Sequence, residues 1–339
     1  MKAFRIIAPG KTEYGEAPKP SFTADDILIK VHRVGFCGSD LSTYRGANPL
    51  VTYPRIPGHE VAGEIAAVGE RVPASLRVGQ SVTVLPYTAC GACAACRQGQ
   101  ANACERNATL GVQRDGAFTE FIAVPWPSVL AADLADRSLA LVEPLAIGGH
   151  AVQRAQVKPG EHVLVIGCGT VGLGAIAVAA QVHGAQVIAT DIDDAKLATA
   201  RKAGAAHALR SDSRDFIGEL RAIIPDGPQV VVEAVGSPLT YVLAVDAVAF
   251  AGRVAFIGYS AAPVTFDTKL FVKKELTLRG SRNATQADFS MVLDLIQQGK
   301  FPVRETVTEE VTWARAAEAL DGWSAHPAGV GKIHVLIDP

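Results

Sequence analysis

The sequence lacks an excess of charge of either sign. Its 32 Lys and Arg residues nearly balance 34 Asp and Glu residues, for a formal net charge of −2. This balance argues against a nucleic-acid-binding protein, which needs a basic face, although a local basic patch can exist within a neutral total. Aromatic residues reach only 6% and charged residues 19%, whereas hydrophobic residues reach 49% and glycines number 32. This composition excludes disorder, and 339 residues are enough for two α/β domains.

The sequence also lacks an uninterrupted apolar segment that would span a membrane. The 29 residues between Glu161 and Asp191 carry no charged side chain, which is long enough to cross a bilayer. However, four glycines interrupt the first half and polar residues the second, so two strands and a buried helix explain the segment better. The N-terminal apolar run meets Pro9 almost at once and lacks the pattern of a secretory signal. We therefore expect a cytoplasmic protein with no membrane partner.

The pattern of strands and helices changes along the chain. Up to about residue 145, short apolar runs alternate with glycine, proline and acidic turns, as in a β-rich domain. From about residue 156, β-branched runs alternate with helical segments, which is typical of a doubly wound parallel sheet. The interpretation is a cofactor domain at residues 148–284, inserted into a β-rich domain of residues 1–147 and 285–339.

A glycine-rich motif, G-x-G-x-x-G, directly follows the first β-branched run of the predicted cofactor domain. Its first glycine allows a tight turn, its second lets the backbone approach a pyrophosphate, and its third lets helix and strand pack closely. An acidic residue ends the next strand nineteen residues later, where it can accept hydrogen bonds from the adenosine ribose. The predicted cofactor-binding residues are Gly167, Gly169, Thr170, Val171, Gly172, Asp191 and Lys196.

Asp191 also predicts which dinucleotide binds. A carboxylate at this place repels the 2′-phosphate of NADP, and the next three residues add two acids and no arginine. We therefore expect NAD. For Lys196, a solvated helix lysine is almost as good an interpretation as a contact with the ribose.

Four of the six cysteines fall within fifteen residues: Cys90, Cys93, Cys96 and Cys104. Because thiols stay reduced in the cytosol, this cluster indicates a metal site rather than disulfides. The two-residue spacers let consecutive sulfurs reach one tetrahedral centre, and four protein ligands leave no open position. We predict a structural zinc ion here, because the surrounding sequence shows no electron-transfer module that would favour an iron–sulfur cluster.

A second set of candidate ligands is spread over three segments. Cys37 lies in a Gly-Phe-Cys-Gly-Ser-Asp segment, His59 and Glu60 follow twenty-two residues later, and Glu143 precedes a proline. Each alone would most often be a buried thiol or a satisfied polar group. Together they supply a thiolate, an imidazole and two carboxylates, the set needed by a catalytic zinc ion with an open position.

The combination of these motifs resembles the zinc-dependent medium-chain dehydrogenase/reductase family. The segments that carry the resemblance are CGSD, GHEVAGEIAAVG, the four-cysteine loop, EPLAIGGHAV and VLVIGCGTVGLGAI, in the family's order along the chain. Glutamate at 143, where simple ethanol-type enzymes have cysteine, resembles the polyol and threonine dehydrogenase branch. GVQRDGAFTEF and KKELTLRGSRNATQADF resemble bacterial dehydrogenases of galactonate-, gulonate- or idonate-like acids. The resemblance implies an α/β fold with a GroES-like catalytic domain and a Rossmann domain.

The resemblance also implies a mechanism and roles for individual residues. Zinc, held by Cys37, His59 and either Glu60 or Glu143, lowers the pKa of a substrate hydroxyl, and hydride passes to NAD to give a ketone. Ser39 matches the hydroxyl that relays the substrate proton. Beyond it, Ser42 stands where many relatives carry a histidine, which leaves the rest of the relay open.

For the substrate, we expect a sugar acid or polyol such as L-galactonate or L-gulonate. A carboxylate on the substrate would call for an arginine fork, and Arg45, Arg114 and Arg282 are the candidates, with Arg282 preferred. A threonine dehydrogenase would share the zinc ligands. A zinc-free reductase or a regulatory NAD-binding protein on the same fold would leave the complete ligand set without a use. Relatives form dimers or tetramers, so a homo-oligomer is expected.

Overall fold

The computed structural model describes residues 1–337, and these fall into two units. The first unit contains residues 1–143, 285–293 and 307–337, and the second contains residues 144–284 and 294–306. Residues 294–306, which the sequence pattern grouped with the β-rich part, thus belong by their contacts to the second unit. The chain passes between the units at four points, two of which lie within the helices α4 (Val142–Ala155) and α10 (Gln286–Gln297).

The first unit is built on a seven-stranded sheet and a separate hairpin. The path through the sheet is β14-β15-β3-β4-β5-β7, with β6 paired to β3, and only the β14–β15 pair is parallel. The strands are β1 (Lys2–Ala8), β2 (Lys11–Glu16), β3 (Asp26–Gly35), β4 (Glu60–Val68), β5 (Ser81–Val84), β6 (Phe121–Pro125), β7 (Val129–Ala131), β14 (Val307–Thr312) and β15 (Lys332–Leu336). The helices are α1 (Gly38–Tyr44), α2 (Ala94–Arg97), α3 (Asp136–Leu139) and α12 (Ala316–Ala325).

Alternating apolar positions place one face of these strands in a common core. Strand β3 buries four isoleucine and valine side chains completely, and strand β4 adds two more. The aromatic rings of Phe36 and Phe118 stack in this core with centroids 4.6 Å apart, directly beside the start of α1. The core therefore fixes the strand ends from which the loops at Cys37 and His59 begin.

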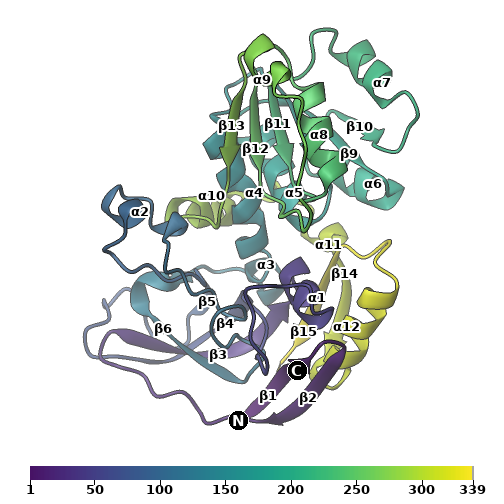
Figure 1. Ribbon diagram of the computed structural model, residues 1–339. Coiled ribbons are helices and arrows are strands. Elements are labelled where there is room, and N and C mark those ends of the chain that lie inside the picture. Colours follow the sequence, from purple (N-terminus) through teal and green to yellow (C-terminus); the bar gives the residue numbers. More distant parts are fainter. Residues whose placement is uncertain (338–339) are drawn as a thin grey trace. The chain divides into compact units, whose positions relative to one another are not determined.

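The second unit is a six-stranded, fully parallel sheet in the order β10-β9-β8-β11-β12-β13. Figure 1 shows these strands side by side, with helices running along them. The strands are β8 (His162–Ile166), β9 (Gln186–Asp191), β10 (His207–Arg210), β11 (Val230–Glu233), β12 (Arg253–Phe256) and β13 (Thr277–Gly280). The helices are α5 (Thr170–Ala177), α6 (Asp194–Lys202), α7 (Phe216–Ile223), α8 (Pro238–Ala247), α9 (Lys269–Lys273) and α11 (Val303–Thr306).

This strand order reverses between β8 and β11, and such a reversal creates a crevice at the carboxyl ends of the strands. The two units together confirm the predicted α/β class, with a β-rich part and a doubly wound parallel sheet. Among the described residues, no helix has both the length and the apolar character that a membrane crossing requires.

Candidate functional site

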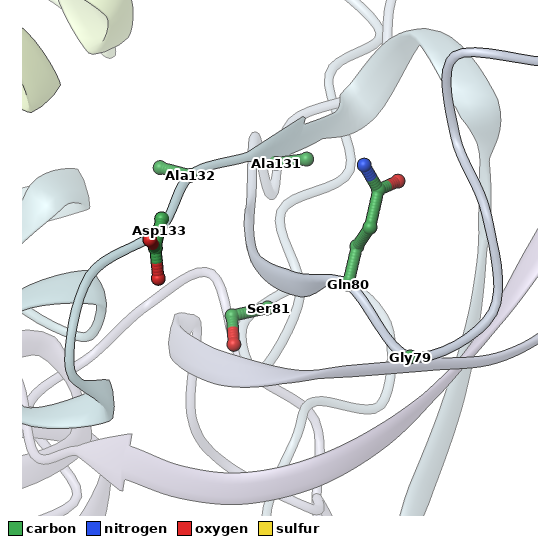
Figure 2. A pocket seen from close by; sticks show the side chains of 6 residues that line it. All are labelled: Gly79, Gln80, Ser81, Ala131, Ala132 and Asp133. Atoms are coloured by element: carbon green, nitrogen blue, oxygen red, sulfur yellow. The ribbon is translucent and has the colours of Figure 1, made fainter.

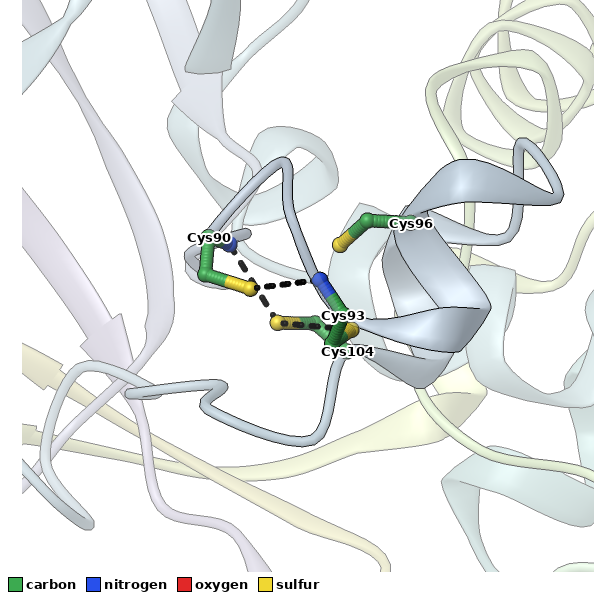
Figure 3. A group of neighbouring side chains, drawn as sticks. All are labelled: Cys90, Cys93, Cys96 and Cys104. Carbon is green, nitrogen blue, oxygen red and sulfur yellow. Dashed lines mark hydrogen bonds between the residues drawn. The ribbon is translucent and has the colours of Figure 1, made fainter.

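The four cysteines of the loop form one compact cluster. One ligand atom from each of Cys90, Cys93, Cys96 and Cys104 lies within 4.8 Å of all the others. Figure 3 shows the sulfurs converging, with Cys93 at the start of the short helix α2 and Cys96 within it. The thiols of Cys93 and Cys104 are 3.9 Å apart, and all four cysteines are free of disulfides. The loop thus presents four sulfurs to one centre.

The backbone of this loop favours thiolates. Backbone N–H groups of Cys96 and Glu105 lower the pKa of Cys93 to about 6, and those of Ala92 and Cys93 lower the pKa of Cys90. In contrast, burial and the neighbouring sulfurs raise the pKa of Cys96 to about 11. Cys90 and Cys93 therefore lose their protons easily, whereas Cys96 does not. A divalent cation is needed before all four cysteines can be thiolates together.

A second cluster gathers residues from two separate places in the first unit. Ligand atoms of Cys37, His59 and Glu60 lie within 4.8 Å of one another, and His59 and Glu60 are buried. Cys37 is the N-cap of α1, and Glu60 is the first residue of β4. The register places Gly35 opposite Glu60, and a Cβ at Gly35 would lie 2.0 Å from Glu60 Oε2. Glycine at this position therefore makes room for the carboxylate.

Asp40 joins the two loops that carry these ligands. Its Oδ2 accepts the backbone N–H of Cys37 at 2.8 Å, and its Oδ1 accepts that of Gly58 at 3.2 Å. Burial raises the pKa of Asp40, whereas His59 and these N–H groups lower it. The carboxylate holds the backbone next to two candidate ligands, which fixes their spacing.

Each of the two candidate carboxylates is held by one donor. Lys332 on β15 donates to Glu60 Oε1 at 2.5 Å and to the carbonyl of Phe36 at 2.9 Å, and the lysine and glutamate side chains are 5% and 0% exposed. The buried Tyr87 donates a short hydrogen bond to Glu143 Oε1. Glu60 Oε2 remains buried without a hydrogen-bond partner. Glu60 therefore has an oxygen available within the cluster of ligand atoms.

Burial and charged neighbours shift the pKa values of two of the candidate ligands, His59 and Glu60. Burial lowers the pKa of His59, but the Cys37 thiolate and the carboxylates of Glu143 and Asp40 outweigh burial and raise it well above its usual value. Burial raises the pKa of Glu60 to about 7 even though Lys332 opposes this. The only other buried cation among the residues that act on His59 or Glu60 is Lys332. The sulfur, nitrogen and oxygen donors of Cys37, His59 and Glu60 form a set that fits a zinc ion.

In the second unit, the glycine-rich loop has the backbone geometry that its motif predicts. Gly167 has φ +96°, a conformation that L side chains rarely adopt, and a Cβ at Gly172 would lie 1.8 Å from the Gly167 carbonyl oxygen. Helix α5 starts at Thr170, and no side chain caps its N-terminus at Gly169. Its N–H groups and dipole are therefore free for a ligand phosphate, which fits a dinucleotide.

Asp191, at the end of β9, is anchored toward this loop. Its Oδ2 accepts the backbone N–H of Cys168 at 2.7 Å, and its Oδ1 accepts that of Asp193 at 3.1 Å. Arg210 pairs with Asp191 in the register of β9 and β10, and its guanidinium binds Asp194 and Asp212. Strand pairing therefore places an arginine beside Asp191, although none occurs among the three residues that directly follow Asp191 in the sequence.

The three candidate substrate-binding arginines differ in their surroundings. Arg45 donates to the hydroxyl and carbonyl of Ser324. Arg114 is half-buried and donates to the carbonyls of Ala108 and Pro86, and burial lowers its pKa. Arg45 thus contacts helix α12 and Arg114 holds loops of the first unit, whereas Arg282 lies in the second unit.

Ser39 lies in the first turn of α1. The Ser39 hydroxyl oxygen is buried and has no hydrogen-bond partner.

A separate pocket of about 330 Å³ lies beside β5 and β7 and is lined by residues 79–81 and 131–133 (Figure 2). Asp133 is its one ionisable side chain, so this pocket has neither a metal-binding set nor an acid–base pair.

Comparison with known proteins places this chemistry in a family. Residues 23–133 match the alcohol dehydrogenase GroES-like domain, and residues 170–298 match the zinc-binding dehydrogenase domain. L-galactonate-5-dehydrogenase of Escherichia coli K12 is 39% identical over 88% of this chain and 87% of its own length. The chain therefore belongs to the zinc-binding alcohol dehydrogenase family and is an enzyme.

Solved structures of similar proteins contain both dinucleotides. A protein described as a short chain alcohol dehydrogenase of E. coli CFT073, in complex with NADH, matches with a TM-score of 0.91 and 31% identity, over 99% of each chain. A zinc-binding dehydrogenase from Sinorhizobium meliloti, bound to NADP, matches with a TM-score of 0.90 and 26% identity, over 99% of this chain and 98% of its own. The family fold therefore accommodates either cofactor.

Sequence reasoning missed Lys332, Tyr87 and Arg210. Lys332 and Tyr87 each hold a candidate carboxylate, yet Lys332 is 272 residues from Glu60 and Tyr87 is 56 residues from Glu143. A lysine that begins a mainly apolar closing strand was the available signal for Lys332. Tyr87 and Arg210 gave no comparable signal, because their partners are set by strand pairing and loop packing.

Proposed function

We propose that the protein is a zinc- and NAD-dependent dehydrogenase that oxidises a secondary hydroxyl of a sugar acid or polyol to a ketone. The observation that carries the proposal is the convergence of ligand atoms from Cys37, His59 and Glu60, because three ligands leave one position of a tetrahedral centre for the substrate. The glycine-rich loop and Asp191 support a dinucleotide partner in the second unit. The reaction removes a hydride and a proton from the alcohol.

Zinc would supply the Lewis acidity that lowers the pKa of the substrate hydroxyl, and NAD would supply the hydride acceptor. Cys37, His59 and Glu60 would hold the catalytic ion, and the four cysteines of the loop would hold a second, structural ion. Glu143, fixed by Tyr87, lies close enough for its charge to raise the pKa of His59. Its carboxylate can therefore orient a water or a substrate hydroxyl near the cluster.

Ser39 is the proposed first acceptor of the substrate proton. Its buried hydroxyl lacks a partner, so it can accept one hydrogen bond and donate another. The Cys37–Asp40 contact holds the start of α1, where Ser39 lies. Ser39→Ala should lower turnover and shift its pH profile, whereas Ser42→Ala should shift neither if the relay leaves the protein at Ser39.

The preference for NAD is proposed on the carboxylate of Asp191. At about 4 Å, two unit charges repel by about 4 kcal/mol at an effective dielectric constant near 20, which corresponds to about 100-fold or more in kcat/KM. Steady-state kinetics with NAD and NADP measure the preference. Asp191→Asn should reduce it, and equal use of both cofactors by the wild-type enzyme would contradict the proposal.

The substrate class is tested by a screen with zinc and NAD, followed by NADH absorbance. Aldonates such as L-galactonate and L-gulonate, neutral polyols and L-threonine form the panel. Turnover of an aldonate, abolished by Cys37→Ala, is the expected result. Arg282→Ala should then raise the KM for that aldonate and leave the KM for a neutral polyol unchanged. Turnover of threonine alone would instead support the threonine dehydrogenase alternative, which shares the zinc ligands.

A homodimer or homotetramer is also proposed. In the second unit, Val272 and Tyr259 are 84% and 78% exposed, and β13 pairs on one side only, with β12. An exposed strand edge next to apolar side chains suits pairing with a second copy of the chain. Light scattering after size exclusion should give a mass of two or four chains, and a monomer at micromolar concentration would contradict this.

A further inference from the structure

A buried glutamate outside the metal clusters lies at the carboxyl edge of the parallel sheet. Glu233 is the last residue of β11, is fully buried, and pairs in register with Ile166 of β8 and Phe256 of β12. It therefore lies next to the reversal of strand order, where open parallel sheets bind their ligands. No metal ligand and no ion pair accounts for its charge among the described residues.

One oxygen of this carboxylate closes the turn between β11 and α8. Glu233 Oε1 accepts the backbone N–H groups of Val235 at 2.9 Å and Gly236 at 2.8 Å, and the hydroxyl of Thr240 at 2.8 Å. Its other oxygen, Oε2, is buried without a hydrogen-bond partner. A buried carboxylate oxygen without a donor is unfavourable. The three hydrogen bonds to Oε1 offset this cost, and they explain why a glutamate occupies this position.

The turn held in this way, residues 234–236, is packed between two other strand ends. A Cβ at Gly167 would lie 2.6 Å from Val235 Cγ2, so the turn contacts the glycine-rich loop on one side. A Cβ at Gly258 would lie 2.2 Å from the nitrogen of Gly236, so it contacts the end of β12 on the other. The Val235 side chain is nevertheless 51% exposed, an apolar surface at the ligand-binding edge of the sheet.

The strand order indicates which half of a dinucleotide this turn faces. Asp191, proposed to bind the adenosine ribose, ends β9 on one side of β8, and the phosphate-binding loop follows β8 itself. Strand β11 lies on the opposite side of β8 from β9. A dinucleotide that extends across the strand ends thus brings its nicotinamide half to β11.

We propose that Glu233 is a positioning residue that fixes the 234–236 turn, and with it the apolar Val235, against the nicotinamide ring of the cofactor. This inference rests on the proposed binding of NAD. The adenosine and pyrophosphate contacts belong to other strands, so losing the Glu233 hydrogen bonds affects one half of the ligand selectively. Gln can place a carbonyl oxygen where Oε1 lies, whereas Ala cannot.

The test compares two ligands, NADH and ADP-ribose, which lacks nicotinamide, by titration calorimetry on the full-length enzyme. Glu233→Ala should weaken NADH by about tenfold or more, since hydrogen bonds to a charged group are lost, and leave ADP-ribose within about twofold. Glu233→Gln should restore most of the NADH affinity. Thr240→Val, which removes one of the three donors, should have a smaller effect in the same direction and covers the case in which Glu233→Ala does not fold.

Lys274→Met is the matched control. Lys274 donates to the carbonyls of Val245, Asp246 and Val248 at the far end of α8, so its loss should lower the Tm without changing the ratio of the two affinities. Equal weakening of NADH and ADP-ribose by Glu233→Ala would overturn the inference, as would a Gln variant as weak as the Ala variant. If wild-type enzyme binds neither ligand, it is the proposed NAD dependence that fails.

Discussion

The two clusters of candidate metal ligands are built in opposite ways. The four-cysteine cluster comes from a single segment of fifteen residues, and backbone N–H groups of that segment stabilise its thiolates. The Cys37–His59–Glu60 cluster is assembled from a helix start and a strand start, and it depends on Lys332, which is 272 residues from Glu60. A local loop provides a closed site, whereas a site with an open position needs the rest of the fold to hold it.

The largest expected effect is the loss of activity without loss of the fold. Cys37→Ser should lower kcat by about a thousandfold or more, because the Lewis acid supplies several kcal/mol of transition-state stabilisation. Its Tm should stay within about 2 °C of wild type, since Asp40 continues to bind the backbone of residue 37. Metal analysis should show one zinc equivalent lost. A variant that keeps its turnover would remove Cys37 from the proposed mechanism.

The reverse pattern is expected for the closed cluster. Cys96→Ser should also lose one zinc equivalent but lower the Tm by about 5 °C or more, because a structural zinc contributes directly to folding free energy. Thermal denaturation and metal analysis of the two variants side by side measure the contrast. If Cys37→Ser and Cys96→Ser lowered the Tm equally, the distinction between an open and a closed site would be wrong.

A smaller effect is expected from the residue that holds Glu143. Tyr87→Phe removes the hydroxyl that donates a hydrogen bond to Glu143, so kcat should fall by about tenfold, and the visible spectrum of the cobalt-substituted enzyme should change. Tyr44→Phe is the matched control, because Tyr44 likewise donates to a carboxylate, that of Asp321, at 2.9 Å. Both readouts should be unchanged in Tyr44→Phe, and unchanged readouts in Tyr87→Phe would exclude Tyr87 from the site.

The smallest expected effect is on the stability of the protein in acid, and it comes from His334, a histidine outside the proposed metal site. Burial, followed by Lys332, Arg33 and Arg137, lowers the pKa of His334 well below its usual value, with Glu310 opposite it in the strand register. The unfolded chain therefore binds a proton that the folded chain excludes, and stability is lost as the pH falls below about 6.5. His334→Met should reduce this loss by up to about 1.4 kcal/mol per pH unit in urea unfolding.

His32 provides a control of opposite sign for that measurement. The carboxylate of Asp136, 3.2 Å away, raises the pKa of His32 above its usual value although burial opposes it. Its contribution to stability is thus present below about pH 6.5 and is lost as the pH rises through the raised pKa. His32→Gln should change the pH dependence in the opposite direction from His334→Met, and a change in the same direction would contradict the assignment.

The sequence by itself determined what is encoded locally. Spacing alone predicted the four-cysteine cluster, and the alternation of β-branched runs with helices predicted the parallel sheet of the second unit. The glycine motif fixed the turn after β8, because a side chain at Gly172 would meet the Gly167 carbonyl. Apart from the pairing of β8 with β11, the interacting groups lie within about twenty-five residues of one another, so short-range geometry suffices.

The tertiary structure decided which distant side chains meet. Only strand pairing brings Lys332 to Glu60, and only loop packing brings Tyr87 to Glu143 and the 234–236 turn to Gly167. It also showed that Arg45 and Arg114 bind backbone carbonyls and that Arg210 lies beside Asp191. Such contacts follow from strand register and from the burial of charge, which no motif in a single sequence records.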